Sequence, residues 1–221
     1  MPAPELPRPG VDASSLPGRL VDLVRVEREW HGPLLWQGIG RHAELWAGTP
    51  TGPFAEESEF AAWLEARLER PDQALFAIFD NTGEGEEIAG LLFIISILPA
   101  MGTAELGLVY GPGLQRTAGG TEAVYLALRH LFATLEYRRV EWRCNVANQA
   151  SLRAARRFGF TLEGVLRRHR WLKGSNCDTA LHAIIDSDWP TIGRRLEAWL
   201  EPSNFSAEGR QIASLSEMTH R

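Results

Sequence analysis

The stretch best suited to chemistry is a loop of small residues between a strand-like run and a helix-like run. Leu108, Val109 and Tyr110 end an apolar strand, Gly111 to Gly113 follow, and a helical pattern begins near Thr121. Backbone N–H groups in such a loop can approach an anion closely, and a helix N-terminus adds partial positive charge. The pattern therefore predicts a pyrophosphate site, with a plain strand–helix connection as the alternative.

The loop lacks both common nucleotide-binding motifs. It contains neither the Gly-x-Gly-x-x-Gly of dinucleotide-binding folds nor the Gly-Lys-Ser/Thr of a P-loop. Taken alone, the loop leaves the identity of the anion open, and a nucleotide phosphate is one of the alternatives.

Gln115, Ala118 and Gly120 stand where motif A of the GNAT superfamily has Gln/Arg-x-x-Gly-x-Gly/Ala, so the loop resembles that of acetyl-CoA-dependent N-acetyltransferases. The following Thr-Glu-Ala, residues 121–123, resembles the helix start of the RimJ/RimL-like branch. Ala118 replaces the usual glycine, and because alanine disfavours positive φ we expect a slightly reshaped loop. Arg116 also stands where many members have glycine.

The resemblance continues on both sides of the loop. Asn148 to Ser151, followed by Phe158 to Phe160, resembles the Asn-x-x-Ser…Leu-Gly-Phe of motif B, and Ala104 to Gly107 resembles the Ala-Glu-Ile-Gly before motif A. Residues 163–178 resemble the end of RimJ/RimL-like domains. The match covers roughly residues 19–190.

This resemblance implies acetyl-CoA as cosubstrate and no metal. The pantetheine chain would lie between the strands expected at 104–110 and 139–145. Backbone groups of Leu108, Val109 and Tyr110 would pair with its amides, and the N–H of Val109 or a neighbour would face the thioester oxygen. The other implied cofactor-binding residues are Gln115, Arg116, Thr117, Ala118, Gly119, Gly120, Thr121, Asn148 and Ser151.

Acetyl transfer to an amine needs a base, because amines are largely protonated at neutral pH. Glu105 is the leading candidate, since it lies on the strand expected to approach the thioester; a solvated strand carboxylate is the alternative. Glu141 and Glu163 are weaker candidates, and Glu163 could instead hold nearby arginines. The resemblance implies that Ser151 gives a proton to the leaving thiolate, the alternative being a serine that satisfies the first helical turn.

Several other side chains have structural explanations. Asn148 is a good N-cap residue, besides the cofactor contact that the resemblance implies. Three arginines, Arg153, Arg156 and Arg157, either reach a phosphate or form a solvated basic face. Cys144 lies near the expected thioester, but without a paired base a buried thiol is favoured over an acetyl-cysteine. Trp30, Trp36 and Trp46 fall among helices where the family binds acceptors, and core packing is the simpler explanation for them.

Charge is unevenly distributed along the 221 residues, whose net charge is −5. Residues 1–110 carry 7 basic and 17 acidic side chains, while residues 111–190 carry 12 and 7. An acidic chain argues against a nucleic-acid partner, and the basic second half fits a cosubstrate with several phosphates. The acidic first half suits a cationic acceptor.

Two cysteines in a chain of this length indicate a reduced, cytoplasmic protein. The most apolar run, residues 88–98, is about half as long as a membrane span, so no membrane association is expected. Composition divides the chain into a Pro-rich arm (1–17), a single domain (18–201) and a polar tail (202–221), with both ends expected to be loose.

Hydrophobic periodicity predicts a mixed α/β fold, with a mostly antiparallel sheet flanked by helices. Three consecutive strands favour an antiparallel meander, and the strand–helix–strand at 104–145 favours one parallel pair. Strands are predicted at 20–26, 74–79, 88–98, 104–110, 139–145, 165–172 and 178–185, a turn at 81–85, and helices at 27–46, 56–70, 121–136, 148–158 and 189–200. The resemblance implies the GNAT fold.

Together these features predict an N-acetyltransferase that moves the acetyl group of acetyl-CoA to a primary amine by direct attack in a ternary complex. The acceptor is either a protein N-terminus or a small amine, and a homodimer stays open. The alternative is a non-catalytic regulator that binds acyl-CoA on the same fold.

Overall fold

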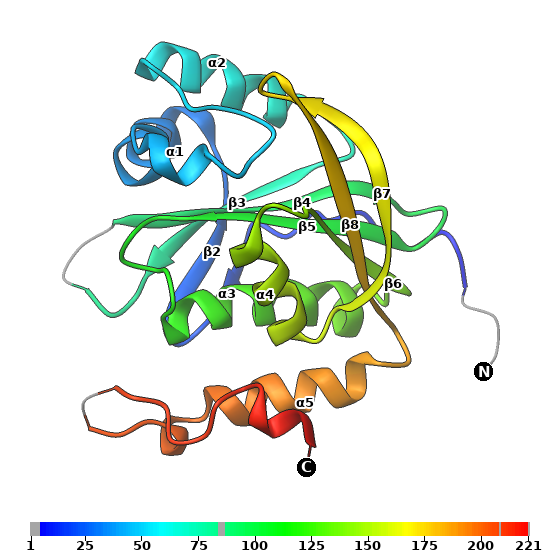
Figure 1. Ribbon diagram of the computed structural model, residues 1–221. Coiled ribbons are helices and arrows are strands. Elements are labelled where there is room, and N and C mark those ends of the chain that lie inside the picture. The colour runs from blue at the N-terminus through cyan, green and yellow to red at the C-terminus, as the bar shows by residue number, and fades with distance from the viewer. Residues whose placement is uncertain (1–4, 84–86, 208, 221) are drawn as a thin grey trace.

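The computed structural model describes residues 5–83, 87–207 and 209–220. In this part of the chain eight strands form one sheet, in the order β1-β2-β3-β4-β5-β6-β8-β7, with only β5 and β6 parallel (Figure 1). The strands are β1 (Ser15–Pro17), β2 (Val21–Arg25), β3 (Ala74–Asp80), β4 (Ile88–Leu98), β5 (Thr103–Tyr110), β6 (Arg139–Asn145), β7 (Thr161–Leu172) and β8 (Ser175–Ile185). The predicted mixed α/β class and the parallel pair are confirmed.

Helices cover both faces of this sheet. Figure 1 shows α1 and α2 on one face and α3 and α4 on the other, and α5 packs on the outside of α3. The helices are α1 (Arg28–Leu35), α2 (Glu57–Leu68), α3 (Ala118–Arg129), α4 (Gln149–Phe158) and α5 (Trp189–Leu200). Short π-helical turns follow α1 (Trp36–Gly40) and α3 (His130–Thr134), and 3-10 turns lie at Ala43–Trp46, Pro202–Asn204 and Glu217–His220. None of the described helices is long and apolar enough to cross a membrane.

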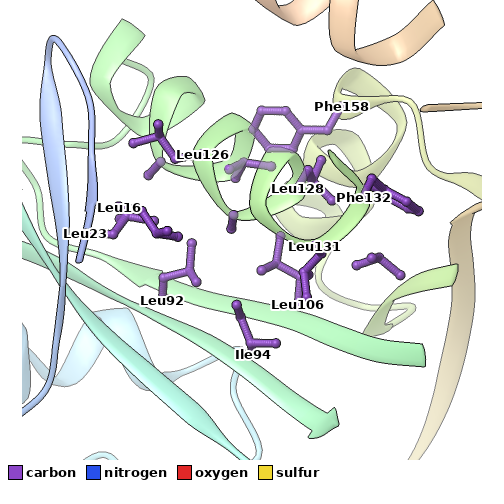
Figure 2. Packing of buried hydrophobic residues seen from close by; sticks show 14 of the residues in the cluster. Leu16, Leu23, Leu92, Ile94, Leu106, Leu126, Leu128, Leu131, Phe132 and Phe158 are labelled. Carbon is purple, nitrogen blue, oxygen red and sulfur yellow. The ribbon is translucent and has the colours of Figure 1, made fainter. Parts of the chain in front are cut away.

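Two hydrophobic cores lie on opposite faces of the sheet, because successive side chains of a strand point to opposite sides. In β5, Ala104 and Leu106 belong to the core under α3, whereas Val109 belongs to the core under α1 and α2. Figure 2 shows Leu128 and other side chains of α3 packed over strand residues that include Leu106. By the same alternation, Glu105 faces the α1–α2 side.

β5 and β6 part soon after they meet. They pair from Thr103 with Arg139 to Glu105 with Glu141, and the described pairing ends there. β5 nevertheless continues beside β4 as far as Tyr110. Residues 106–110 therefore line an opening between two neighbouring strands of the sheet.

The helix predicted at 121–136 begins earlier, at Ala118, and changes to a π-helical turn at His130. Its early start has a local cause, because Oγ1 of Thr117 accepts a hydrogen bond from the N–H of Gly120 at 3.1 Å. One turn further on, the buried Glu122 accepts hydrogen bonds from the backbone N–H groups of Leu20, at 2.5 Å, and Val21, at 2.9 Å. This carboxylate ties α3 to the beginning of β2.

Both ends of the chain are better packed than their composition indicates. Residues 15–17 form β1 beside β2, and Val11 and Leu16 are buried in the core under α3. Near the other end, Leu215 is buried in the same core. The expected looseness is wrong for these segments, because a few apolar side chains anchor otherwise polar or Pro-rich stretches. The boundaries at 17/18 and 201/202 stay a prediction.

Three of the predicted segments include residues that lie outside the described ones. These are the turn at 81–85, the arm at 1–17 and the tail at 202–221, of which 84–85, 1–4, 208 and 221 are not described.

Candidate active site

A single cleft of about 1450 Å³ crosses the opening between β5 and β6 and extends over both faces of the sheet. It is larger than the ~300–1,000 Å³ typical of small-molecule pockets, so it has room for a long ligand. The predicted catalytic and cofactor-binding residues line it, with the exception of Gly119: Glu105, Leu108, Val109, Tyr110, Gln115, Arg116, Thr117, Ala118, Gly120, Thr121, Asn148 and Ser151. The fold thus brings together residues that lie 46 positions apart in sequence.

One end of the cleft is the first turn of α3. Capping by Thr117 uses the N–H of Gly120, while those of Ala118 and Gly119 have no intrahelical acceptor because they lie in the first turn. Gly120 has a packing role, since an added Cβ would lie 2.8 Å from the Leu114 carbonyl oxygen. The helix N-terminus therefore presents free N–H groups and partial positive charge to the cleft.

The left-handed backbone of this loop lies at Arg116 and not at Ala118. Ala118 is the first residue of α3 and is not among the residues with positive φ, so its backbone is one that alanine adopts readily. The expected reshaping of the loop stays a prediction. Arg116, two residues before Ala118, has a φ of 63°. This left-handed conformation is the one that glycine adopts without cost, and here the chain places an exposed arginine in it.

The backbone of β5 offers hydrogen-bonding groups to the opening. Gly111 donates its N–H to the Ala89 carbonyl oxygen across the β4 ladder at 2.8 Å, and Val109 pairs with Leu91 in the same register. In a strand, alternate residues direct their N–H and C=O groups to the same side, so Val109 is directed at β4. Leu108 and Tyr110 are directed at the opening. The prediction named Val109 or a neighbour as the oxyanion donor, and the direction of the backbone groups favours the neighbours, Leu108 and Tyr110.

Glu105 lies at the point where the strands separate. It is 8% exposed, and Nε of Arg143 on β6 lies 3.1 Å from its Oε2. Burial raises the pKa of Glu105 above its usual range, while the positive charges of Arg143 and Arg170 oppose this rise. A buried carboxylate with a raised pKa, facing a cleft, has the properties required of a general base.

The two weaker base candidates are engaged elsewhere. Glu163 receives two hydrogen bonds from Arg139, at 2.8 and 2.6 Å, and this pairing lowers its pKa. Glu141 accepts hydrogen bonds from both Arg139 and Arg143, at 2.9 and 3.0 Å. Neither carboxylate lines the cleft among the described residues, which leaves Glu105 as the better placed of the three.

Ser151 lies in the first turn of α4, across the opening from β5. Its backbone N–H donates to Oδ1 of Asn148 at 3.0 Å, which confirms Asn148 as the N-cap of α4. Its hydroxyl oxygen accepts a hydrogen bond from Nε1 of Trp142 at 2.9 Å. Since one lone pair is held by the indole, the hydroxyl hydrogen can be donated to Sγ of Cys144, with which Ser151 forms a hydrogen bond, or to a ligand atom in the cleft.

Cys144 lines the cleft beside Ser151 but is half-buried, and burial raises the pKa of its thiol. The hydrogen bond with Ser151 acts in the opposite direction and is the smaller effect. A protonated thiol is a weak nucleophile, so this environment favours a structural role. Among the described residues, no group of three or more His, Cys, Asp or Glu side chains could hold a metal ion.

Arg157 on α4 was not singled out from its two basic neighbours by sequence reasoning. It is half-buried, donates a hydrogen bond to Oγ1 of Thr121 at 3.0 Å, and stacks over Trp199 at 4.9 Å. None of the ion pairs among the described residues includes Arg157, and Arg195 adds a like charge nearby. A guanidinium placed in this way, beside the first turn of α3, favours an anionic ligand.

Aromatic side chains line the opposite end of the cleft. Trp46 is 1% exposed and packs edge-on against Trp63, and both line the cleft. Core packing is thus confirmed for Trp46 and for the partly buried Trp36, whose ring lies 5.9 Å from that of Phe60. It is wrong for Trp30, which is 73% exposed.

Sequence reasoning missed several residues because they come from segments with no motif. Arg67 and Arg70 lie near the end of α2, Arg143 on β6 and Arg170 on the edge strand β7, and all four line the cleft. Phe205, Arg210 and Gln211 of the C-terminal segment also line it. The positive charges of the four arginines were the available signal in the sequence, but the register of the strands was needed to place them in the cleft.

Comparison with known proteins agrees with this architecture. The family model for an acetyltransferase (GNAT) domain matches residues 25–161. A GCN5-related N-acetyltransferase from Brucella melitensis superposes with a TM-score of 0.92, at 34% identity over 98% of this chain and 99% of that protein. The ribosomal-protein-serine acetyltransferase of Escherichia coli (strain K12) is 32% identical over 114 residues, 51% of this chain. The matched region spans 62% of that relative's length.

A spermidine N-acetyltransferase from Vibrio cholerae, solved in complex with CoA and spermine, has a TM-score of 0.65 at 18% identity. The match covers 77% of this chain and 98% of that protein. At this level of identity the likeness is one of fold.

Proposed function

Since the chain belongs to the GNAT acetyltransferase family, we propose that it transfers the acetyl group of acetyl-CoA to a primary amine by direct attack in a ternary complex. The observation that carries this proposal is the separation of β5 and β6 beyond Glu105, in one cleft with the capped N-terminus of α3. That arrangement offers backbone donors for a pantetheine chain and an anion site for its phosphates.

The residues present fit acetyl-CoA. The first turn of α3 and Arg157 would hold phosphates, because they supply free N–H groups and a positive charge with no carboxylate partner among the described residues. Leu108 and Tyr110 would pair with the pantetheine amides through backbone groups directed at the opening. When bound, acetyl-CoA supplies an activated acyl group.

Glu105 accepts a proton from the acceptor amine, directly or through a water molecule. It suits this role because burial raises its pKa toward that of the amine, which eases proton transfer, while Arg143 keeps its charged form accessible. A backbone N–H of Leu108 or Tyr110 stabilises the negative charge that develops on the thioester oxygen. Ser151 gives its hydroxyl proton to the departing sulfur as the carbon–sulfur bond breaks, and takes a proton from water in return.

These roles place the two substrates on opposite sides of the sheet. Glu105 faces the α1–α2 side, and Ser151 lies on α4, on the other side. The acceptor thus enters from the α1–α2 side and the cosubstrate from the α3–α4 side, and they meet in the opening. The relatives act on a ribosomal-protein serine or on spermidine by name, and we propose a protein N-terminus or a small amine as the acceptor class.

The decisive experiment measures thiol release from acetyl-CoA with serine-led peptides, spermidine and aminoglycosides, with mass spectrometry of the products. The expected result is thiol release that depends on the acceptor, together with an acetylated product. Tight binding of acetyl-CoA without thiol release from any acceptor would favour the alternative, a non-catalytic acyl-CoA-binding regulator.

A further inference from the structure

We propose that the acceptor amine carries a carboxylate, and that Arg67 and Arg170 bind it at the α1–α2 end of the cleft. This inference rests on the proposed function and specifies its acceptor class. The two arginines come from α2 and β7, which lie 103 residues apart in sequence yet line the same cleft as Glu105.

Strand register places Arg170 on the same face of the sheet as Glu105. Arg143 contacts Glu105 and pairs with Leu181 of β8, so Leu181 lies on the same face of the sheet as Glu105. Because every second residue of a strand shares a face, Thr179 and Cys177 lie on it too. Arg170 pairs with Cys177 across the β7–β8 ladder. It therefore faces the acceptor side of the cleft, opposite to the phosphate end.

Arg67 reaches this end of the cleft from the helix above it. Its guanidinium stacks over Trp63 at 5.8 Å and donates a hydrogen bond to Gln73 at 3.4 Å. Arg67, Trp63 and Gln73 all line the cleft. Burial lowers the pKa of Arg67, and the like charges of Arg70 and Arg170 lower it further, while the single carboxylate of Asp72 opposes them. Three positive charges therefore lie close together around one carboxylate.

The carboxylates at this end are mostly engaged with other arginines. Asp72 receives two hydrogen bonds from Arg70, at 3.1 and 3.2 Å, and Glu105 pairs with Arg143. Glu44 is 70% exposed and lies 3.6 Å from His42. None of the ion pairs among the described residues includes Arg67 or Arg170.

An acceptor carboxylate would compensate this excess of positive charge. The planar guanidinium matches a carboxylate in geometry, as the paired hydrogen bonds between Arg70 and Asp72 already illustrate. A carboxylate also carries less charge than a phosphate, and so disturbs the ionised form of the neighbouring Glu105 less. The amine of such an acceptor can then reach Glu105 while its carboxylate is held further from the thioester.

This conclusion reverses the expectation from the charge of each half of the sequence. The first half of the chain is acidic overall, which suits a cation. The cleft, however, draws Arg67 and Arg70 from that half and Arg143 and Arg170 from the basic half. Local placement decides the preference, because exposed charges beyond about 8–10 Å are largely screened.

The test compares kcat/KM for thiol release with three acceptors: a peptide amide that begins Ser-Glu-Glu, its Ser-Gln-Gln counterpart, and spermidine. We expect the acidic peptide to be preferred by about tenfold or more, which is the contribution of one hydrogen bond to a charged group. Arg67→Gln and Arg170→Gln should each reduce that preference, and Arg67→Lys should keep part of it. Arg129→Gln, an exposed arginine outside the cleft, serves as the matched control.

The outcomes separate this inference from the proposed function. Equal turnover of all three acceptors, or a preference for spermidine, would overturn the inference while the acetyltransferase function stands. Thiol release from none of them would contradict the proposed function instead. In that case calorimetric titration of the CoA-bound protein with the two peptides still tests the acidic preference. Equal affinities for the two peptides would refute it. A loss of affinity for the acidic peptide alone in Arg67→Gln would support it.

Discussion

Nε of Arg143 lies 3.1 Å from Oε2 of Glu105, and this ion pair spans β5 and β6 where the two strands begin to separate. It opposes the effect of burial on Glu105, because a nearby positive charge favours the ionised carboxylate. The pair thus sets the pH range in which the proposed base is available.

Replacing Glu105 with glutamine removes the proposed base while keeping the size of the side chain. We expect kcat/KM to fall by about 10²–10⁴-fold, with the affinity for acetyl-CoA unchanged. Because Glu105 acts as a carboxylate with a raised pKa, wild-type activity rises with pH through a pKa above the usual glutamate range. That limb should disappear in the variant.

The measurement is a pH–rate profile alongside calorimetric binding of acetyl-CoA. Glu163→Gln is the matched control, because Glu163 pairs with Arg139 away from the cleft. Full turnover by Glu105→Gln with an unaltered pH profile would refute the assignment of the base.

Arg143→Gln should shift the pH dependence of the activity strongly and change the maximal rate only slightly. Loss of the positive charge raises the pKa of Glu105 further, so the acidic limb of the profile moves to higher pH and activity recovers at alkaline pH. Arg143→Lys retains a charge and should retain much of the wild-type limb. If the acidic limb of the pH–rate profile stays at the same pH in Arg143→Gln, that limb does not report the ionisation of Glu105.

Ser151→Ala should lower kcat by about tenfold or less. A thiol has a pKa near ~8.5, so water can protonate the leaving thiolate almost as well as a serine can. Trp142→Phe removes the indole donor to Ser151 and tests whether that hydrogen bond orients the hydroxyl. A loss of a thousandfold in Ser151→Ala would point to a larger role than proton donation.

Arg157→Gln should weaken CoA binding by about tenfold or more, which is the scale of a charge-assisted hydrogen bond. Its neighbour Arg156 is exposed and does not line the cleft, so Arg156→Gln is the control on the same helix. Calorimetry at two salt concentrations measures the effect, and the salt dependence should decrease in Arg157→Gln alone. Equal affinities in the two variants would exclude a phosphate contact.

Glu122→Ala should reduce the free energy of unfolding by about 1–3 kcal/mol, because it leaves the N–H groups of Leu20 and Val21 without their acceptor. Glu197→Ala, at an exposed position on α5, should change it by less than about 0.5 kcal/mol. Chemical denaturation of both variants measures the difference. Equal midpoints would show that the contact between α3 and β2 does not contribute to stability.

Much of the fold could be read from local patterns. The strands at 88–98 and 139–145 and the helix at 189–200 lie within the predicted bounds, since their apolar periodicity is continuous and their ends carry turn or capping residues. β1 was missed because its three residues, which end at Pro17, are too few to carry a periodic signal. The helix α3 begins earlier than its apolar pattern because the Thr117 side chain, and not hydrophobicity, fixes its first turn.

The sequence by itself determined which residues could bind a phosphate chain and which carboxylate could act as base, because residue type and spacing along one strand–loop–helix unit are local properties. Tertiary structure decided which backbone groups face the opening, since pairing with β4 directs Val109 away from it. It also decided the charge of the acceptor end, because the arginines there come from α2, β6 and β7. Strand register and the curvature of the sheet bring those side chains together, and neither can be read from charge along the chain.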